Sequence, residues 1–230
     1  TMRCCEQIKV NLGYMKQKIT MVGLASGLVL GPLGYTHCWI EDIGVLRSIP
    51  NLTIISPADG LELVKALIAS FKHNQSVYLR LTGSSNAPII YEKDYKFEIG
   101  KSVTLKKGKD VTIFANGNMV NIAIEVSKKI KEKKIEASVI NVHTIKPIDV
   151  SVIKKNLKSK LFVSIEEHNI IGGLGSAISE VTATYKNSPK HLFFGVNDEY
   201  AFSGDYNFLL KKYGLTTEKI SKKIKDNLKI

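Results

Sequence analysis

The chain has 230 residues, of which 44% are apolar and 23% charged, a composition typical of a globular protein with one or two domains. Its longest apolar stretch, near residues 21–33, is interrupted by glycine and proline and is too short to span a membrane. Its three cysteines have neither disulfide-framework nor CxxC spacing, which favours a reduced, cytoplasmic protein.

The net charge of +12 raises the possibility of a nucleic-acid partner, but its make-up argues against one. Arg3, Arg47 and Arg80 are the only arginines, and the lysines cluster in helix-like segments with apolar residues between them. Because arginine dominates base and phosphate recognition, we expect solvated helix faces and no nucleic-acid partner.

Short β-branched runs alternate with helical segments in the first part of the chain. The predicted elements are a helix over 3–16, a strand over 18–24, a helix over 37–48, a strand over 52–56, a helix over 61–72 and a strand over 76–82. Thr36 and Asp59 are expected to cap the second and third helices. Three strands are few for a parallel sheet, so this unit is expected to be incomplete at its N-terminus or completed by another chain.

Turn residues without helical periodicity over 83–101 predict a linker. Beyond it, strands are expected over 110–117, 136–143, 160–168 and 191–196, with helices between and after them, and with 144–149 turning the chain into one of those helices. The predicted fold is therefore α/β, with two three-layer αβα units and mostly parallel sheets. We place the first domain at 1–90, the linker at 91–100 and the second domain at 101–230.

A glycine-rich turn, GGLGSA (172–177), follows the predicted strand that ends in EEH (166–168). Such a turn can hold a phosphate at a helix N-terminus, but Ile178 occupies the third glycine position of GxGxxG. We favour a close strand-to-helix turn. Glu166, Glu167 and His168 alternate across a strand and are not expected to converge on a metal.

Several long motifs resemble the transketolase family. GPLGYTHCWIEDIGVLRSIPNLTIISPADGLEL (31–63) resembles the transketolase pyrimidine-domain signature. GKDVTIFANGNMV, VINVHTIKPID, EEHNIIGGLGSAISE and FSGDYNFLLKKYGLTTEKI resemble the transketolase C-terminal domain, in the same order. The resemblance covers nearly the whole chain and is closest to the C-terminal subunit of a transketolase split over two chains.

The resemblance implies thiamine diphosphate chemistry, in which a two-carbon ketol unit passes from a ketose to an aldose. The family's GDG…N motif for diphosphate and Mg²⁺ does not occur here. Both are therefore expected on a partner, the N-terminal transketolase section, within a homodimer or heterotetramer. The family's pyrimidine-contacting glutamate lies upstream of the segment that matches residues 2–6, so we expect an N-terminally truncated section that is inactive alone.

The resemblance also implies site residues. His37 matches a histidine that faces the reacting carbon, and is expected to be catalytic and, with Thr36, substrate-binding. Arg3 matches an arginine near the cofactor pyrimidine. Glu41 and Asp42 are expected to be structural residues at a helix start.

Three departures from the family pattern concern the substrate. Leu33, Ala25 and Gly83 stand where transketolases carry an acid, a histidine and a phosphate-binding arginine. The sequence therefore predicts that sugar phosphates are not preferred substrates.

Two other functions stay open at this point. A β subunit of a 2-oxo-acid decarboxylating enzyme would need a lipoyl-carrier partner, and the TIKPID segment fits transketolase better. A non-catalytic dimerisation or regulatory module is the alternative if residue 1 is the true start.

Overall fold

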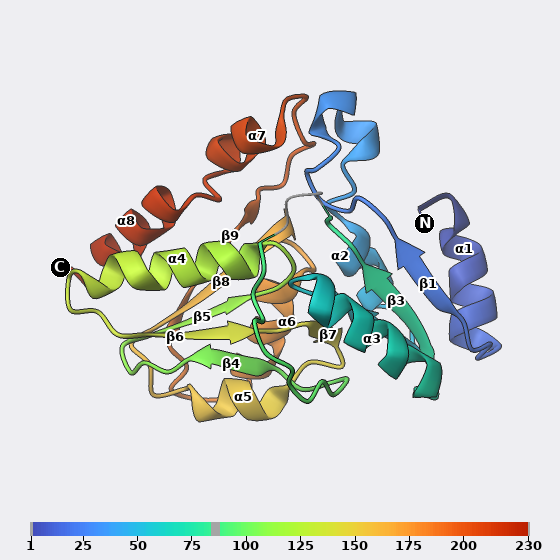
Figure 1. Cartoon of the computed structure of the whole chain (residues 1–230), viewed down its shortest axis with the longest axis horizontal. Helices are drawn as coiled ribbons and strands as arrows, with labels where there is room; N and C mark the ends of the chain where they lie inside the picture. The colour runs from blue at the N-terminus through green and yellow to red at the C-terminus, as the bar shows by residue number, and fades with distance from the viewer. Residues whose placement is uncertain (1, 84–87, 230) are drawn as a thin grey trace.

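The computed structural model describes residues 2–83 and 88–229 (Figure 1). Two sheets form within these residues, with strand orders β1-β3-β2-β7 and β4-β6-β5-β8-β9. The strands are β1 (Thr20–Gly23), β2 (Leu52–Ile55), β3 (Ser76–Arg80), β4 (Val103–Lys106), β5 (Val111–Ala115), β6 (Ala137–Asn141), β7 (Thr144–Lys146), β8 (Leu161–Asn169) and β9 (Lys190–Val196).

Helices flank both sheets. The α-helices are α1 (Cys5–Gln7), α2 (Asp42–Arg47), α3 (Gly60–Lys72), α4 (Met119–Lys131), α5 (Val150–Lys155), α6 (Leu174–Thr182), α7 (Tyr206–Tyr213) and α8 (Thr217–Leu228). Tighter or wider helical turns complete the set: η1 (Met2–Cys4), η2 (Ile8–Tyr14), η3 (Gly31–Leu33) and η4 (Tyr35–His37). The predicted α/β fold with two mostly parallel sheets is thus confirmed.

The strands at the centre of each sheet are buried on both faces. β2, β3, β5 and β6 are buried along their whole length, and their mutual pairings are parallel. Continuous apolar runs are what such two-sided burial requires, because helices cover both faces of a parallel sheet. This explains why these strands could be predicted from composition alone.

The fourth strand of the first sheet comes from the second half of the chain. Residues 144–149 were expected only to turn the chain, but Thr144–Lys146 form β7, antiparallel to β2. The register pairs Ile54 with Lys146, and the Ser56 N–H also donates to the His143 carbonyl at 2.7 Å. One extended passage therefore continues from β6 in the second sheet into β7 in the first.

Two helix predictions needed correction. The expected helix over 3–16 is divided into η1, α1 and η2, and the one over 37–48 begins only at Asp42. Thr36 is consequently not an N-cap and lies in the η4 turn. Asp59 does cap α3, because its Oδ1 accepts the Glu62 N–H at 2.9 Å.

The described part of the linker packs against the start of α3. Asp59 Oδ2 accepts the N–H groups of Ile90 and Tyr91, at 2.9 and 2.8 Å. Behind it, the buried Glu62 carboxylate accepts from the Tyr91 hydroxyl and from Asn141 Nδ2 in the second sheet. One polar cluster therefore joins the linker, the start of α3 and the second sheet.

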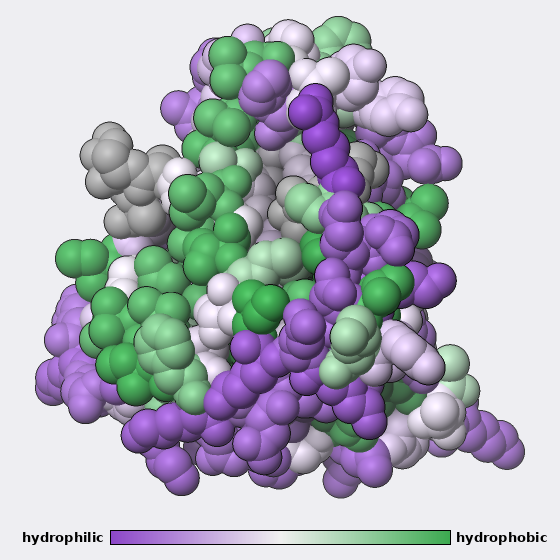
Figure 2. Space-filling view, turned by 90° about the vertical axis from the view of Figure 1, so that its right-hand side faces the viewer, coloured by the Kyte–Doolittle hydropathy of each residue, from purple (hydrophilic) through white to green (hydrophobic). Residues whose placement is uncertain are grey.

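Helix α3 and the edge strand β1 carry exposed apolar side chains. Figure 2 shows hydrophobic residues gathered on the side of the molecule formed by the N-terminal helical turns, β1 and α3. The exposed apolar residues of β1, its flanks and α3 are Ile19, Val22, Leu24, Val64, Leu67, Ile68 and Phe71. Contiguous apolar surface of this kind is typical of interaction sites.

Candidate functional site

The segment between β1 and α2 carries the residues that the sequence marks as functional. It forms the η3 and η4 turns, which stand at the top of the molecule in Figure 1, beside the chain that leads into α7. The Gly204 N–H donates to the Gly31 carbonyl at 3.1 Å, which ties the segment to that neighbour. Gly27 and Gly34 both have φ of +83°, a conformation that side-chain-bearing residues rarely adopt. The two glycines therefore define the path of the backbone here.

His37 and Thr36 lie together on the surface of this segment. Both are exposed, and Thr36 Oγ1 is 3.1 Å from His37 Nδ1. This contact engages one ring nitrogen and leaves Nε2 as the nitrogen for a ligand. The arrangement can present a hydrogen-bond donor to an external substrate.

Glu167 at the end of β8 holds the start of the segment. Its Oε1 accepts the Leu28 N–H at 2.6 Å, and its Oε2 accepts the Tyr206 hydroxyl at 2.7 Å. Burial raises the pKa of Glu167 to about 7, although both of these hydrogen bonds act to lower it. Glu167, on the second sheet, thus holds the backbone of the segment that follows β1 of the first sheet.

A buried ion pair supports the end of the segment. Arg80 Nε lies 2.7 Å from Asp42 Oδ2, which also accepts the Tyr78 hydroxyl at 2.9 Å. Both charged side chains are essentially inaccessible. The guanidinium also donates to the Glu167 carbonyl at 2.9 Å, so the pair links α2, β3 and β8. Asp42 is therefore a structural residue, as expected.

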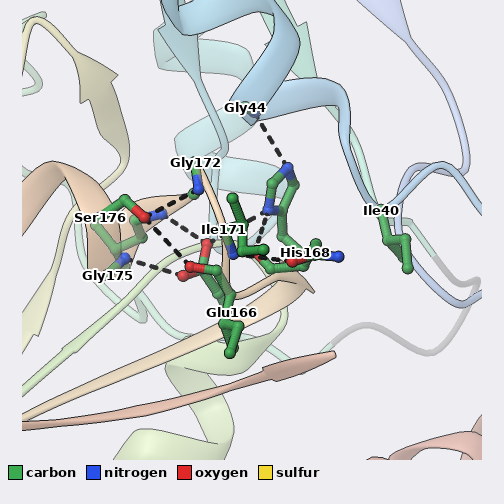
Figure 3. A network of polar contacts seen from close by, with 12 residues as sticks. Ile40, Gly44, Glu166, His168, Ile171, Gly172, Gly175 and Ser176 are labelled. Atoms are coloured by element: carbon green, nitrogen blue, oxygen red, sulfur yellow. Dashed lines mark hydrogen bonds and ion pairs between the residues drawn. The ribbon is translucent and has the colours of Figure 1, made fainter. Parts of the chain in front are cut away.

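His168 has one protonation state in this environment. Its Nε2 accepts the Gly44 N–H at 3.2 Å, so Nδ1 carries the proton and donates to the Asn169 carbonyl at 2.6 Å (Figure 3). Burial lowers the pKa of His168 to about 4, which keeps the imidazole neutral. The residue is thus a fixed contact between β8 and α2.

Glu166 occupies the glycine-rich turn that could have held a phosphate. Its carboxylate accepts the N–H groups of Leu174 and Gly175, at 2.6 and 2.9 Å (Figure 3). A Cβ at Gly173 would overlap this carboxylate, and one at Gly172 would lie 2.8 Å from the Gly44 Cα. The helix N-terminus is therefore filled by the protein's own carboxyl group, and its glycines serve close packing, as favoured from the sequence.

The remaining predicted residues lie elsewhere or lack polar groups. Arg3 is exposed in η1, and Figure 1 shows the N-terminal turns apart from η3 and η4. Leu33 is exposed in η3, and Ala25 has a positive φ of 55°. No contact joins Arg3 to His37 within the described residues.

Gly83 lines a hollow of about 200 Å³ beyond the carboxyl ends of β2 and β3. The described residues around it are Pro57, Ala58, Asp59, Gly60, Leu63, Leu81, Thr82 and Asn118, with no cation among them. The described part of this hollow therefore has no arginine or lysine with which to pair a phosphate.

Over residues 2–83 and 88–229, no group of three or more His, Cys, Asp or Glu side chains is placed to hold a metal ion. Within the same residues, no helix has the length and apolarity needed to cross a bilayer.

Two family models account for most of the chain. The transketolase pyrimidine binding domain matches residues 1–87, and the transketolase C-terminal domain matches residues 100–220. The chain belongs to the transketolase family. Transketolases are thiamine-diphosphate-dependent transferases, so the predicted class of enzyme is confirmed at the level of the family.

Its relatives include parts of split transketolases. It is 34% identical over 222 residues to a subunit of the apulose-4-phosphate transketolase of Phocaeicola vulgatus, covering 96% of this chain and 70% of the relative. It is 36% identical over 220 residues to 6-deoxy-6-sulfo-D-fructose transketolase subunit SqwH of Clostridium sp. strain MSTE9, covering 95% and 67%.

Among solved structures, a split-gene transketolase described as an inactive β4 tetramer superposes with a TM-score of 0.87 and 32% identity, over 97% of this chain and 71% of the other. Transketolase of Campylobacter jejuni superposes with a TM-score of 0.76 at 19% identity, over 95% of this chain and 33% of that one, and shows the shared fold alone.

Sequence reasoning did not find the polar partners of the segment. It gave neither Arg80 nor Tyr206 a role at this segment, yet both contact Glu167. The available signal was weak: Glu167 and Tyr206 each fall inside a transketolase-like motif, but no spacing relates them. Only the fold brings these residues together.

Proposed function

We propose that this chain is the substrate-side part of a ketol transferase that moves a two-carbon unit from a ketose to an aldose. Its active site is shared with a diphosphate-binding chain or domain. The observation that carries this proposal is the exposed Thr36–His37 pair on a glycine-defined segment of a transketolase pyrimidine domain.

The residues present fit one side of a thiamine diphosphate site. When bound, thiamine diphosphate supplies the carbanion that takes up the two-carbon unit. His37 would donate a hydrogen bond to oxygen that becomes negatively charged during transfer, and Thr36 would orient the ring through Nδ1. The exposed Arg3 would approach the cofactor pyrimidine from the N-terminal turns.

The metal side of the site belongs to the partner in this proposal. The described residues lack a cluster of metal ligands, and the one glycine-rich helix start is filled by Glu166. Mg²⁺ and the diphosphate are therefore assigned to the N-terminal transketolase section. The exposed apolar face of β1 and α3 supports an assembly, as a dimer of such pairs. The free cysteines support a cytoplasmic location.

The test is transfer activity in the assembled enzyme. The chain is combined with the diphosphate-binding chain, thiamine diphosphate and Mg²⁺, and ketose and aldose panels are scanned for two-carbon transfer. His37→Ala should lower kcat about hundredfold, because one charge-stabilising donor is worth two to three orders of magnitude. Tyr35→Phe, in the same turn, is the control and should keep full activity.

Two outcomes would contradict the proposal. Transfer that survives His37→Ala unchanged would remove His37 from the site. Activity with a 2-oxo acid and a lipoyl carrier, without ketose cleavage, would support the decarboxylating alternative instead.

A further inference from the structure

We propose that Glu167 is the positioning residue that places His37, acting from the second sheet on the loop of residues 28–40. This inference deepens the proposed function. The hydrogen-exchange test below is independent of that function, and only the kinetic test rests on it. It begins from two contacts: Glu167 Oε1 accepts the Leu28 N–H at 2.6 Å, and Oε2 accepts the Tyr206 hydroxyl at 2.7 Å. The carboxylate thus joins the first residue of the loop to α7.

The loop is fastened at its other end by the same strand. The Asn169 N–H donates to the Ile40 carbonyl at 2.7 Å, two residues beyond Glu167 on β8. The Gly27 N–H donates to the Trp39 carbonyl at 3.1 Å and so joins the two ends of the loop to each other. Residues 28–40 are therefore a closed loop whose base rests on β8.

The base is built for a glutamate at this position. Gly27 has φ of +83°, and a Cβ there would overlap Glu167 Oε1. The backbone consequently approaches the carboxylate as closely as glycine allows. Glu167 is 1% exposed, so the Leu28 N–H would have no water to replace a lost acceptor.

Glu166 is a matched control on the same strand. It is also 1% exposed, and its carboxylate also accepts two protein donors, but these are the N–H groups of Leu174 and Gly175. Replacing either glutamate with alanine removes the same atoms and leaves two buried donors unpaired. The two alanine variants should therefore lose similar amounts of global stability. They should differ only in which segment becomes less protected from hydrogen exchange.

Hydrogen exchange followed by mass spectrometry tests the placement without any assay of activity. In E167A, exchange of residues 28–38 should rise about tenfold to hundredfold, whereas in E166A the rise should fall on residues 172–176. E167Q should restore protection of 28–38, because its amide oxygen can accept the Leu28 N–H and its NH₂ can donate to the Tyr206 oxygen. If E167A does not fold, Tyr206→Phe leaves Glu167 in place and removes only the Tyr206 hydroxyl, which donates to Glu167 Oε2 and accepts from Asn118 Nδ2 at 3.4 Å. This variant should raise exchange of 28–38 about threefold.

The proposal would be overturned if E167A left residues 28–38 protected, or if E166A loosened them equally. If residues 28–38 exchanged as fast in E167Q as in E167A, the proposal that Glu167 holds the loop through hydrogen bonds would be overturned.

The kinetic arm uses the assembled enzyme with thiamine diphosphate and Mg²⁺. E167A should lower kcat about tenfold or more while KM for the ketose changes less than about threefold, since the loop positions a group that acts on the transition state. E166A should keep kcat within about threefold of wild type, and E167Q should recover most of it. Loosened exchange with unchanged kcat would show that Glu167 orders the loop but that His37 takes no part in the reaction.

Discussion

At the scale of single residues, the resemblance to transketolases predicted which side chains belong to the site. It did not predict which residues those side chains contact. His37 and Thr36 are exposed side by side, whereas Asp42, five residues further on, is fully buried against Arg80. The sequence could not distinguish these environments, because an acid at a helix start is favourable whether exposed or buried. The buried pairing required knowledge of which strand lies beside α2.

Gly83 offers a test of substrate preference at this scale. Among the described residues, a Cβ at Gly83 would meet nothing within 4 Å, so Gly83→Arg should be accepted without strain and would add a cation beside the hollow at the ends of β2 and β3. We expect the assembled wild-type enzyme to be inefficient with xylulose 5-phosphate, and the variant to raise kcat/KM for it about tenfold.

Gly83→Gln is the control for added bulk and should leave that preference unchanged. The relatives from Phocaeicola vulgatus and Clostridium are named for a phosphorylated and a sulfonated sugar. Efficient turnover of xylulose 5-phosphate by the wild-type enzyme would show that its phosphate is bound through other groups.

At the scale of elements, apolar patterning predicted the central strands because they are buried on both faces. β2, β3, β5, β6 and β8 all fall within the expected ranges, apart from the last residue of β8. The edge strands β4 and β7 were missed, since both are short and antiparallel and neither forms a continuous apolar run. The start of α2 was also misplaced, because helical spacing over 37–48 does not reveal that residues 35–37 form a separate turn.

The turn before α6 has a pH dependence that can be measured. Burial raises the pKa of Glu166 from 4.5 to about 7, against the opposing effect of its bonds to Gly175 and Leu174. Because the pKa is higher in the folded state, its contribution to stability is complete below about pH 4.5 and is lost as pH rises through about 7. Glu166→Gln cannot titrate. Its free energy of unfolding relative to wild type should therefore rise between pH 5 and pH 8, by on the order of 3 kcal/mol.

Urea unfolding at several pH values checks this expectation. Glu132→Gln, at an exposed position after α4, is the control and should show no such trend. A pH-independent difference for Glu166→Gln would mean that the turn holds an ionised carboxylate throughout.

At the scale of the whole molecule, the two predicted domains are joined by strand pairing and by polar contacts. β7 pairs with β2, Asn141 reaches the Glu62 carboxylate, and Arg80 donates to the Glu167 carbonyl. The sequence predicted two domains on either side of a linker at residues 91–100. Residue composition can indicate the linker, but it contains no information about contacts between the two domains. The contacts predict that the two sheets unfold together.

Cooperative unfolding can be followed with the one tryptophan. Trp39 lies in the first part of the chain, with its ring centroid 6.5 Å from that of Tyr78, so its fluorescence reports on the first sheet. Far-ultraviolet circular dichroism reports on both sheets. The two probes should give coincident urea transitions. A tryptophan transition clearly earlier than the dichroism transition would show that the first sheet opens independently.

The pairing of β7 with β2 also bears on how the chain can be divided. If it were cut within residues 88–100, the first piece would lack the strand that closes one edge of its sheet, and the second piece would carry that strand with no sheet to join. Each piece would then expose the groups that the other satisfies. Co-expressed halves should therefore recombine by fragment complementation, with a short antiparallel strand acting as the docking element.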